Sequence, residues 1–351
     1  MSSKGKTGVL IVKQGTPDSP SVQDVRKYLR EFLMDERVID IPYLKRWMLV
    51  NLIIAPTRAP KSAKIYRQLW QPEGSPLKTY GYQVKKLLQD ALGDAFEVEL
   101  AMRYQSPSIE TALAKFKERK ISNILVLPLY LQYASATTGS VFQKVMEVVK
   151  IWDQIPEIKF ITNFLSQPLF TEAFAALGKK YMATASYEHF LFTYHGLPER
   201  QLHKEDGLGN CDHANCATEY HHANQFCYRA QCYETSRLLA EKLGIAPDNY
   251  TVSFQSRLGN EPWIQPYTED VIKDLTAKGI KKVLVFAPSF VADCLETTME
   301  VGHEYKELFE EHGGTDWQLV ESLNDSPLWI ECLREVIANE IVTPAKLKAV
   351  A

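Results

Sequence analysis

The sequence feature that most constrains the fold is an alternation of short apolar runs with longer amphipathic segments. The apolar runs, several of them nearly continuous in leucine or β-branched residues, predict strands. They cover residues 8–12, 98–102, 124–129, 159–161, 190–194, 250–254, 283–286 and 317–320. Amphipathic patterns predict helices, for example at residues 22–33, 109–117, 234–243 and 268–277. Strands that are apolar on both faces and alternate with helices predict a doubly wound α/β fold with parallel sheets.

The length of 351 residues predicts two domains, because single domains usually hold about 100–200 residues. We predict an N-terminal α/β domain at residues 1–165, a C-terminal α/β domain at 166–325, and a C-terminal helix with a tail at 326–351. A weak similarity between residues 120–128 and 279–288 favours two halves of similar build. It has a simpler explanation too, since any two buried strands look alike.

Composition is that of an ordinary globular protein and argues against several classes of function. Hydrophobic residues make up 45% and charged residues 24%, and a net charge of −3 gives no indication of nucleic-acid binding. The P-loop, GxGxxG and GxSxG motifs are absent, which weighs against nucleotide enzymes. The first apolar run is interpreted as a strand and not as a signal peptide, and no apolar window reaches the roughly 20 residues of a membrane span. We therefore expect a cytoplasmic protein, with peripheral contact at the inner membrane left open.

The segments that directly follow the strands are the expected ligand-binding region, because doubly wound folds bind ligands beyond the carboxyl ends of their strands. His195 stands at the end of one predicted strand, and Gly196 and Pro198 favour a turn behind it. An imidazole, with an ordinary pKa of about 6.5, suits a base or a metal ligand. The alternative interpretation is a hydrogen-bonded structural histidine.

A row of carboxylates follows the strand predicted at residues 283–286. Residues 291–304 are predicted to be helical, and Glu296, Glu300 and Glu304 recur there at every fourth position. This spacing aligns the three side chains along one side of a helix. At a strand end such a row can carry protons or hydrated cations. On a solvated face it has no chemical role, and the spacing alone leaves both interpretations open.

Aromatic residues and arginines also gather behind the strands. They are Arg103, Tyr104, Tyr130, Tyr133, Arg257 and Trp263. A large planar, apolar ligand with carboxylate edges needs a lining of this kind. Ordinary core and rim residues give the same pattern, so the ligand is a hypothesis at this point.

Most of the cysteines stand close together in the pattern C-x₄-C-x₁₀-C-x₄-C, formed by Cys211, Cys216, Cys227 and Cys232. A cytosolic chain rarely keeps disulfides, so such a group of thiols indicates a bound metal. Zinc sites more often have shorter spacers, and four thiolates with longer spacers suit a [2Fe–2S] cluster. Unligated thiols are one alternative, and zinc is the other, with His213, His221 or His222 as substitute ligands. Cys294 and Cys332 are expected to pack in the interior.

Ordered segments of the chain resemble the ferrochelatase family. In the first half they are Gly15-Thr-Pro-Asp-Ser-Pro, Tyr28-Leu-Arg-Glu-Phe-Leu, Gly74-Ser-Pro-Leu, Met102-Arg-Tyr and Leu127-Pro-Leu-Tyr-Leu-Gln-Tyr-Ala-Ser-Ala-Thr-Thr-Gly-Ser. In the second half they are Tyr194-His-Gly-Leu-Pro-Glu-Arg, Phe254-Gln-Ser-Arg-Leu-Gly-Asn-Glu-Pro-Trp, Asp293-Cys-Leu-Glu-Thr and Leu323-Asn-Asp-Ser-Pro. They run in order over roughly residues 8–332, and the His-Gly-Leu-Pro and Asp-Cys-Leu-Glu-Thr segments are the most specific.

The resemblance implies two Rossmann-like domains with a porphyrin cleft between them. His195 matches the family's active-site histidine and Glu296 the acidic residue opposite it, both as catalytic groups and as ligands of the incoming iron. Glu300 and Glu304 match acidic positions that lead away from the metal, and Glu300 is a further candidate iron ligand. The residues matched to the porphyrin cleft are Gln14, Arg103, Tyr104 and Trp263.

The chain departs from the family's pattern at two places. Lys13-Gln14 stands where many relatives have asparagine followed by an apolar residue, and Leu131 replaces a common proline. Gln14 therefore puts the identity of one porphyrin contact in doubt, but not the reaction.

The implied reaction is the insertion of Fe²⁺ into protoporphyrin IX, which forms protohaem and releases two protons in haem biosynthesis. A base for the pyrrole protons and carboxylates that guide Fe²⁺ agree with the residues above. Coproporphyrin, or another tetrapyrrole with cobalt or nickel, is the alternative substrate. The non-enzymatic alternative is a haem- or metal-binding module.

Two further segments gain an interpretation from the resemblance. Residues 43–56 match a lip over the porphyrin cleft. Their apolar side chains, with Lys45, Arg46 and Arg58 nearby, suit a membrane interface as well as a buried helix. Some bacterial ferrochelatases hold a [2Fe–2S] cluster in a compact internal four-cysteine segment, which here corresponds to an insertion at about 208–233.

Overall fold

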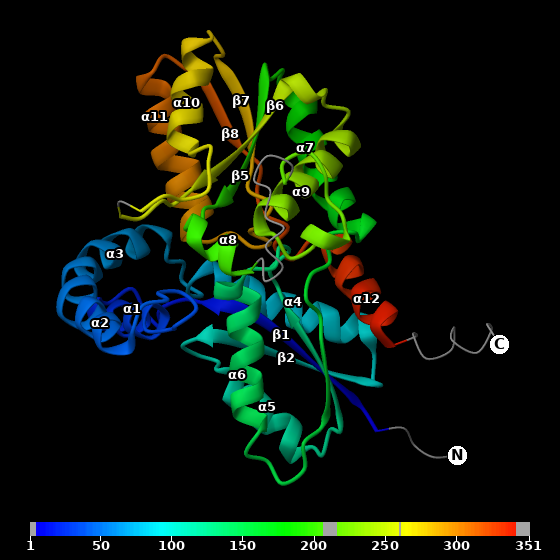
Figure 1. Cartoon of the computed structure of the whole chain (residues 1–351). Helices are drawn as coiled ribbons and strands as arrows, with labels where there is room; N and C mark the ends of the chain where they lie inside the picture. The colour runs from blue at the N-terminus through cyan, green and yellow to red at the C-terminus, as the bar shows by residue number, and fades with distance from the viewer. Residues whose placement is uncertain (1–4, 206–215, 260, 342–351) are drawn as a thin grey trace.

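The computed structural model describes residues 5–205, 216–259 and 261–341, and each half of the chain is built on a parallel sheet of four strands (Figure 1). The first sheet contains β1 (Thr7–Gly15), β2 (Phe96–Tyr104), β3 (Asn123–Pro128) and β4 (Glu157–Phe160). The second contains β5 (His189–His195), β6 (Tyr250–Gln255), β7 (Lys282–Phe286) and β8 (Asp316–Leu319). Every strand predicted from the sequence is confirmed, and with them the doubly wound α/β class.

Helices cover both faces of the two sheets. In the first half they are α1 (Val22–Leu33), α2 (Tyr43–Met48), η1 (Leu49–Ile54), α3 (Ala55–Leu69), α4 (Pro76–Leu92), α5 (Ile109–Glu118), η2 (Ser135–Gly139) and α6 (Ser140–Val149). In the second half they are α7 (Pro168–Thr184), α8 (Glu199–Glu205), η3 (His222–Asn224), α9 (Tyr228–Leu243), η4 (Pro247–Asn249), α10 (Thr268–Ala277), η5 (Glu296–Glu304), α11 (Tyr305–Glu311) and α12 (Pro327–Ile341). η1, η2 and η5 are π-helical, while η3 and η4 are short 3₁₀ turns.

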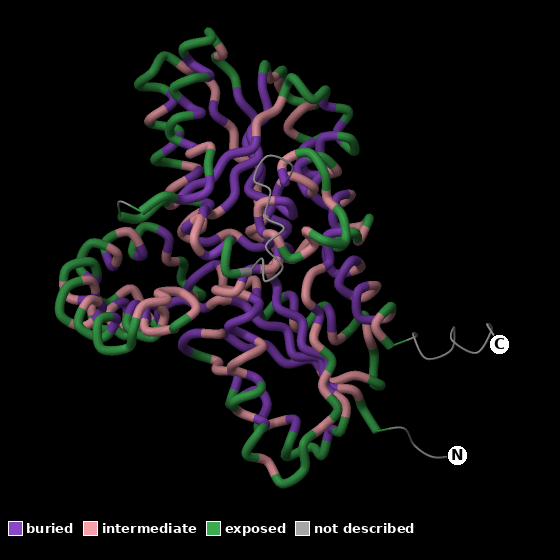
Figure 2. Tube along the Cα trace, viewed as in Figure 1, coloured by how far each residue is buried: buried purple, intermediate pink, exposed green. Residues whose placement is uncertain are grey.

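The inner strands are buried on both faces, as their continuous apolar runs predicted (Figure 2). The glycine that ends β1 is required by a close backbone approach to the neighbouring strand. Gly15 has φ of 119°, and a Cβ there would lie 2.0 Å from the carbonyl oxygen of Tyr104. The next helix, α1, starts at a serine cap, because Ser21 Oγ accepts a hydrogen bond of 3.1 Å from Asp24 N.

Both sheets have the same strand order, β2-β1-β3-β4 in one and β6-β5-β7-β8 in the other. The segments that resemble each other in sequence, 120–128 and 279–288, contain β3 and β7, which occupy equivalent positions. The backbone after each edge strand is also alike, since Gln105 and Ser256 have φ of 68° and 65°. In each sheet the chain first adds a strand on one side and then continues on the other. The change of side falls between β1 and β3 in the first sheet and between β5 and β7 in the second. Those two points are where doubly wound folds bind ligands.

Helix α12 connects the halves, because it packs against α7 of the second half and α4 of the first. Its Trp329 is fully buried, with its ring 5.8 Å from that of Phe164 and 6.2 Å from that of Phe170. The boundary predicted at residues 165/166 falls between β4 and α7. Within the described ranges, no helix is both long and apolar enough to cross a membrane.

Candidate active site

The turn behind β5 holds His195 in place. Gly196 N donates a hydrogen bond of 2.8 Å to the carbonyl of Gln255, and a Cβ on Gly196 would lie 2.9 Å from that oxygen. On the other side, Ile264 N donates to the Leu197 carbonyl at 2.9 Å. The close approach favours glycine, and the two neighbouring segments together fix the turn.

The imidazole of His195 has one nitrogen available for chemistry. Its Nδ1 lies 2.6 Å from the Gly196 carbonyl oxygen. Because a carbonyl only accepts, Nδ1 carries a proton in this contact, and in the neutral imidazole the lone pair is therefore on Nε2. The Trp263 ring lies beside it, with 6.4 Å between centroids, and the buried Trp263 Nε1 has no hydrogen-bond partner in the part of the chain that the structure describes. The half-buried histidine is thus oriented to act as a base or a metal ligand.

The carboxylate row lies on η5, which begins at Glu296. The sequence predicted a helix here, and the structure has one, in the wider π-helical form that often occurs at functional sites. Glu296 and Glu300 are half-buried and Glu304 is exposed. The row therefore leads from the interior to the surface, in the direction that the sequence indicated.

Glu300 connects this helix with His195. Burial raises the pKa of Glu300, and the negative charge of Glu296 raises it further. Hydrogen bonds from Ser256 Oγ (2.6 Å) and Tyr305 OH (3.0 Å) lower it, as does His195 in its protonated form. The charges of both His195 and Glu296 affect the pKa of Glu300, so the Glu300 carboxylate lies near both side chains. The role of His195, Glu296 and Glu300 in metal insertion stays a prediction.

Two tyrosines from the first half of the chain are affected by the charge of Glu296. Burial raises the pKa of Tyr28 and of Tyr66, and the charge of Glu296 raises both further. A hydrogen bond with Gln14 lowers the pKa of Tyr28, so Gln14 is near this group as well. Neither Tyr28 nor Tyr66 was predicted as a site residue, because both lie within helices whose patterns are those of ordinary amphipathic elements.

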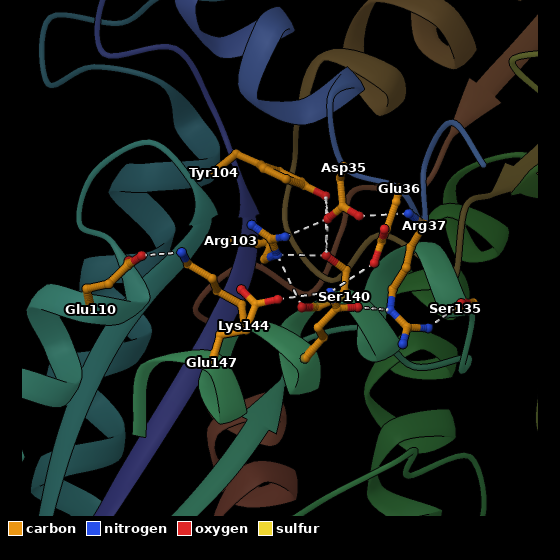
Figure 3. Close-up of polar contacts among 11 residues, drawn as sticks. Asp35, Glu36, Arg37, Arg103, Tyr104, Glu110, Ser135, Ser140, Lys144 and Glu147 are labelled. Atoms are coloured by element: carbon orange, nitrogen blue, oxygen red, sulfur yellow. Dashed lines mark hydrogen bonds and ion pairs between the residues drawn. The ribbon is translucent and has the colours of Figure 1, made fainter. Parts of the chain in front are cut away.

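Arg103 is held in an ion pair with Asp35 (Figure 3). Its Nη2 lies 2.6 Å from Asp35 Oδ2, and its Nε donates to Ser140 Oγ at 2.6 Å. The buried Tyr104 donates from its hydroxyl to the same Asp35 oxygen at 2.9 Å, and its ring lies 4.6 Å from the guanidinium. Asp35 and Ser140 were not foreseen. The predicted contact of Arg103 and Tyr104 with a porphyrin stays a prediction.

The first half of the chain also contributes a buried lysine, Lys13, close to the segment that precedes Glu296. Lys13 is 3% exposed, and its Nζ donates to the Leu77 carbonyl at 3.2 Å. Burial lowers its pKa to about 7, while Cys294 and Asp293 act in the opposite direction. Lys13 therefore faces the segment that leads into Glu296, although the sequence marked it only as a departure from the family.

The cysteine segment is described in part, because Cys211 lies outside the described residues. The sulfur atoms of Cys216 and Cys227 are 3.8 Å apart. Two thiolates on one tetrahedral metal, each at about 2.3 Å, are separated by about the same distance. Burial raises the pKa of Cys232, and Cys227 raises it further, so these two are also near each other. Among the described residues alone, no group of three or more side chains is arranged to hold a metal. The described thiols fit part of a metal site.

The lip at residues 43–56 is helical and largely exposed, in α2 and η1. The alternative of a buried helix is wrong, since Leu44 is 66% and Leu52 62% exposed. Other exposed apolar side chains there are Tyr43, Trp47, Met48 and Ile53. Arg46 turns inward instead, and donates to the carbonyls of Ile39 and Ile41 at 3.0 Å each.

Comparison with solved structures identifies the fold. SirB from Bacillus subtilis with Fe³⁺ is similar in fold, with a TM-score of 0.55 and 12% identity over 95% of each chain. The sirohydrochlorin chelatase SirB from Bacillus subtilis subspecies spizizenii in complex with cobalt gives a TM-score of 0.54 and 10% identity over 97% of each chain. The paired parallel sheets are therefore the chelatase fold.

Sequence comparison then gives the family. The family model described as Ferrochelatase matches residues 6–341. The protein named Ferrochelatase from Coxiella burnetii (strain Dugway 5J108-111) is 43% identical over 342 residues, which are 97% of this chain and 96% of that one. Its counterpart from Legionella pneumophila (strain Corby) is 44% identical over 336 residues, 96% of this chain and 100% of that one. The chain belongs to the ferrochelatase family, as its motifs predicted.

Proposed function

We propose that the protein inserts Fe²⁺ into protoporphyrin IX, forming protohaem and two protons as a step of haem biosynthesis. The observation that carries the proposal is that the pKa of the half-buried Glu300 is affected by the charges of both His195 and Glu296. It supports a site with one base and two carboxylates beyond the carboxyl ends of the second sheet, where ligands bind in doubly wound folds. Membership of the ferrochelatase family supports the choice of metal and macrocycle.

The residues supply what metal insertion requires. A free-base porphyrin loses two pyrrole protons as the metal enters, and His195 Nε2, with its lone pair, is placed to accept a proton. Glu296 and Glu300 can replace water on the incoming Fe²⁺, since carboxylate oxygens are suitable ligands for hydrated divalent metals. The raised pKa of Glu300 makes it a better proton carrier than an ordinary carboxylate. The exposed Glu304 then exchanges protons or cations with solvent.

The test is an oxygen-free assay with the protein, protoporphyrin and Fe²⁺. Loss of porphyrin fluorescence over many turnovers supports an enzyme, whereas loss of one equivalent indicates a binding module. We expect His195→Ala to fold normally and to lose nearly all turnover, while His312→Ala, an exposed control, keeps it. Activity of folded His195→Ala within a few-fold of wild type would contradict the assignment. Repeating the assay with coproporphyrin decides between the two macrocycles.

A [2Fe–2S] cluster on Cys211, Cys216, Cys227 and Cys232 is a second part of the proposal. The 3.8 Å distance between the sulfur atoms of Cys216 and Cys227 supports it. Such a cluster supplies one-electron redox chemistry. Metal insertion needs no electron transfer, so we assign the cluster a structural or regulatory role. A direct connection exists: Tyr228, next to Cys227, donates from its hydroxyl to the backbone carbonyl of His195 at 2.9 Å.

Contact of the lip with a membrane surface is the third part. Exposed apolar side chains with Lys45 and Arg58 beside them suit the interface of an anionic bilayer. The contact would help to deliver a poorly soluble porphyrin. Sedimentation with anionic vesicles tests it: Leu52→Asp should reduce binding without loss of fold. Equal sedimentation of the variant and the wild type would contradict it.

A further inference from the structure

The partner of Arg103 is a single carboxylate, Asp35, which accepts four hydrogen bonds. Asp35 Oδ2 accepts from Arg103 (2.6 Å), Tyr104 (2.9 Å) and Ser140 (2.5 Å). Its Oδ1 accepts from the backbone N–H of Arg37 at 2.8 Å. The side chains of Asp35 and Arg103 are 5% and 15% exposed. The guanidinium is therefore neutralised in a site where water contributes little screening.

This pair lies on the side of the active site that the first half of the chain forms. The pKa of Tyr130, raised mainly by burial, responds to both Tyr28 and Arg103. Tyr28 in turn responds to Glu296 and bonds with Gln14. The packing agrees with this, because Tyr28 and Tyr104 belong to one buried apolar cluster and Leu295, directly before η5, packs against it.

A buried guanidinium without a partner is a strong anchor for a carboxylate, because it offers paired donors and a full charge. Tetrapyrroles differ in how many carboxylates they carry, and coproporphyrin carries more than protoporphyrin. An unpaired Arg103 would therefore favour the substrate with more carboxylates. The neighbouring Lys144 is paired as well, with Glu110, whereas the guanidinium of Arg37 donates to the uncharged side chains of Gln143 and Ser135 (Figure 3).

We propose that Asp35 is a specificity-determining residue, which neutralises Arg103 and thereby disfavours tetrapyrroles with additional carboxylates. Asp35 acts through Arg103 and is therefore a positioning residue. The inference rests on the proposed function and narrows its substrate class. Asp35 and Arg103 are 68 positions apart in the chain, and no motif connects them.

The experiment compares kcat/KM for Fe²⁺ insertion into coproporphyrin and protoporphyrin. Asp35→Asn keeps the shape of the side chain and removes its charge. We expect the coproporphyrin-to-protoporphyrin ratio to rise by about tenfold, the size of one charge-assisted contact, mainly through KM. Ser140→Ala removes the hydrogen bonds of the Ser140 hydroxyl with Asp35 and Arg103 but keeps the ion pair, so its ratio should stay at the wild-type value. Dissociation constants from porphyrin fluorescence without iron should show the same change.

A second variant keeps the test independent of how well Asp35→Asn folds. The double variant Asp35→Asn with Arg103→Gln removes both charges of the ion pair, so the net charge stays that of the wild type. If the substrate does not use the charge of Arg103, the double variant should keep the wild-type ratio. A lower ratio in the double variant means that Arg103 already binds a substrate carboxylate and overturns the inference. An unchanged ratio in folded Asp35→Asn overturns it too. A wild-type protein that metallates neither porphyrin overturns the proposed function itself, and with it the inference.

Discussion

Ser256 donates a hydrogen bond of 2.6 Å from its hydroxyl to the carboxylate of Glu300, from a backbone with φ of 65°. A residue other than glycine in this left-handed region carries a cost of the order of 1 kcal/mol, which the surrounding structure must offset. The conformation turns the chain directly after β6 and presents the hydroxyl to η5. Ser256 therefore stabilises the ionised form of a carboxylate whose burial favours the neutral form.

Replacing Ser256 by alanine should move the pH profile of the reaction. The pKa of Glu300 is already above its ordinary value because of burial, and the lost hydrogen bond would raise it further. If ionised Glu300 serves the reaction, the acidic limb of kcat/KM shifts upward by about half a pH unit to one unit. Ser253→Ala on the same strand should lower stability only, because Ser253 bonds with Thr268 instead. Equal profiles for both variants and the wild type would remove Glu300 from the mechanism.

The carboxylates of η5 should differ in importance along the helix. Glu296 is half-buried and near Tyr28 and Tyr66, whereas Glu304 is exposed at the far end. We expect Glu296→Gln to reduce kcat by at least about a hundredfold, as for loss of a catalytic acid or base. Glu304→Gln should reduce it only a few-fold. Steady-state kinetics under anaerobic conditions measure both, and the reverse order would mean that the acidic path runs in the other direction.

Lys13 should make the protein less stable at neutral pH than at alkaline pH. Its folded pKa of about 7 lies below the ordinary 10.5, so between these values the unfolded chain binds a proton that the folded chain does not. Stability therefore rises with pH across that window, and below pH 7 the penalty of burying the charge is complete.

Lys13→Met removes this penalty and should stabilise the protein by at least about 1 kcal/mol at pH 6.5, with a gain that shrinks toward pH 10. Urea unfolding at several pH values measures the effect. Lys86→Met, at an exposed position of α4, is the matched control and should change little. A gain that grows with pH would contradict the burial of a charged Lys13.

The sequence predicted those parts of the molecule that depend on local pattern. Buried strands are continuous apolar runs, so all of β1 to β8 were found, and His195 was selected because it ends one of them. Pairings between distant residues leave no such pattern, which is why Asp35 beside Arg103 was missed. The exposure of the lip was not predictable for a different reason. Apolar residues at 43–54 suit a core as well as an exposed surface, and only the packing around them distinguishes the two. The π-helical form of η5 was likewise not predictable, since its residues suit an α-helix equally well.

The cysteine segment should determine the colour, the metal content and the local stability of the protein. We expect anaerobically purified protein to be red-brown, with about two iron and two sulfide per chain. Cys227 directly precedes α9, and its sulfur lies 3.8 Å from that of Cys216. Cys227→Ser should therefore remove one ligand and, with it, the bound cluster.

Because a metal site of this kind rarely exists without its metal, the loss should also loosen the segment from about 208 to 233. Faster hydrogen exchange there would show it. Activity should fall as well, since Tyr228 bonds to the His195 backbone, but lower activity alone would not make the cluster catalytic. Cys332→Ala, a buried thiol on α12 outside the segment, is the control and should keep iron and sulfide. Stoichiometric zinc without sulfide in the wild type would overturn the iron–sulfur assignment and leave the chelatase function intact.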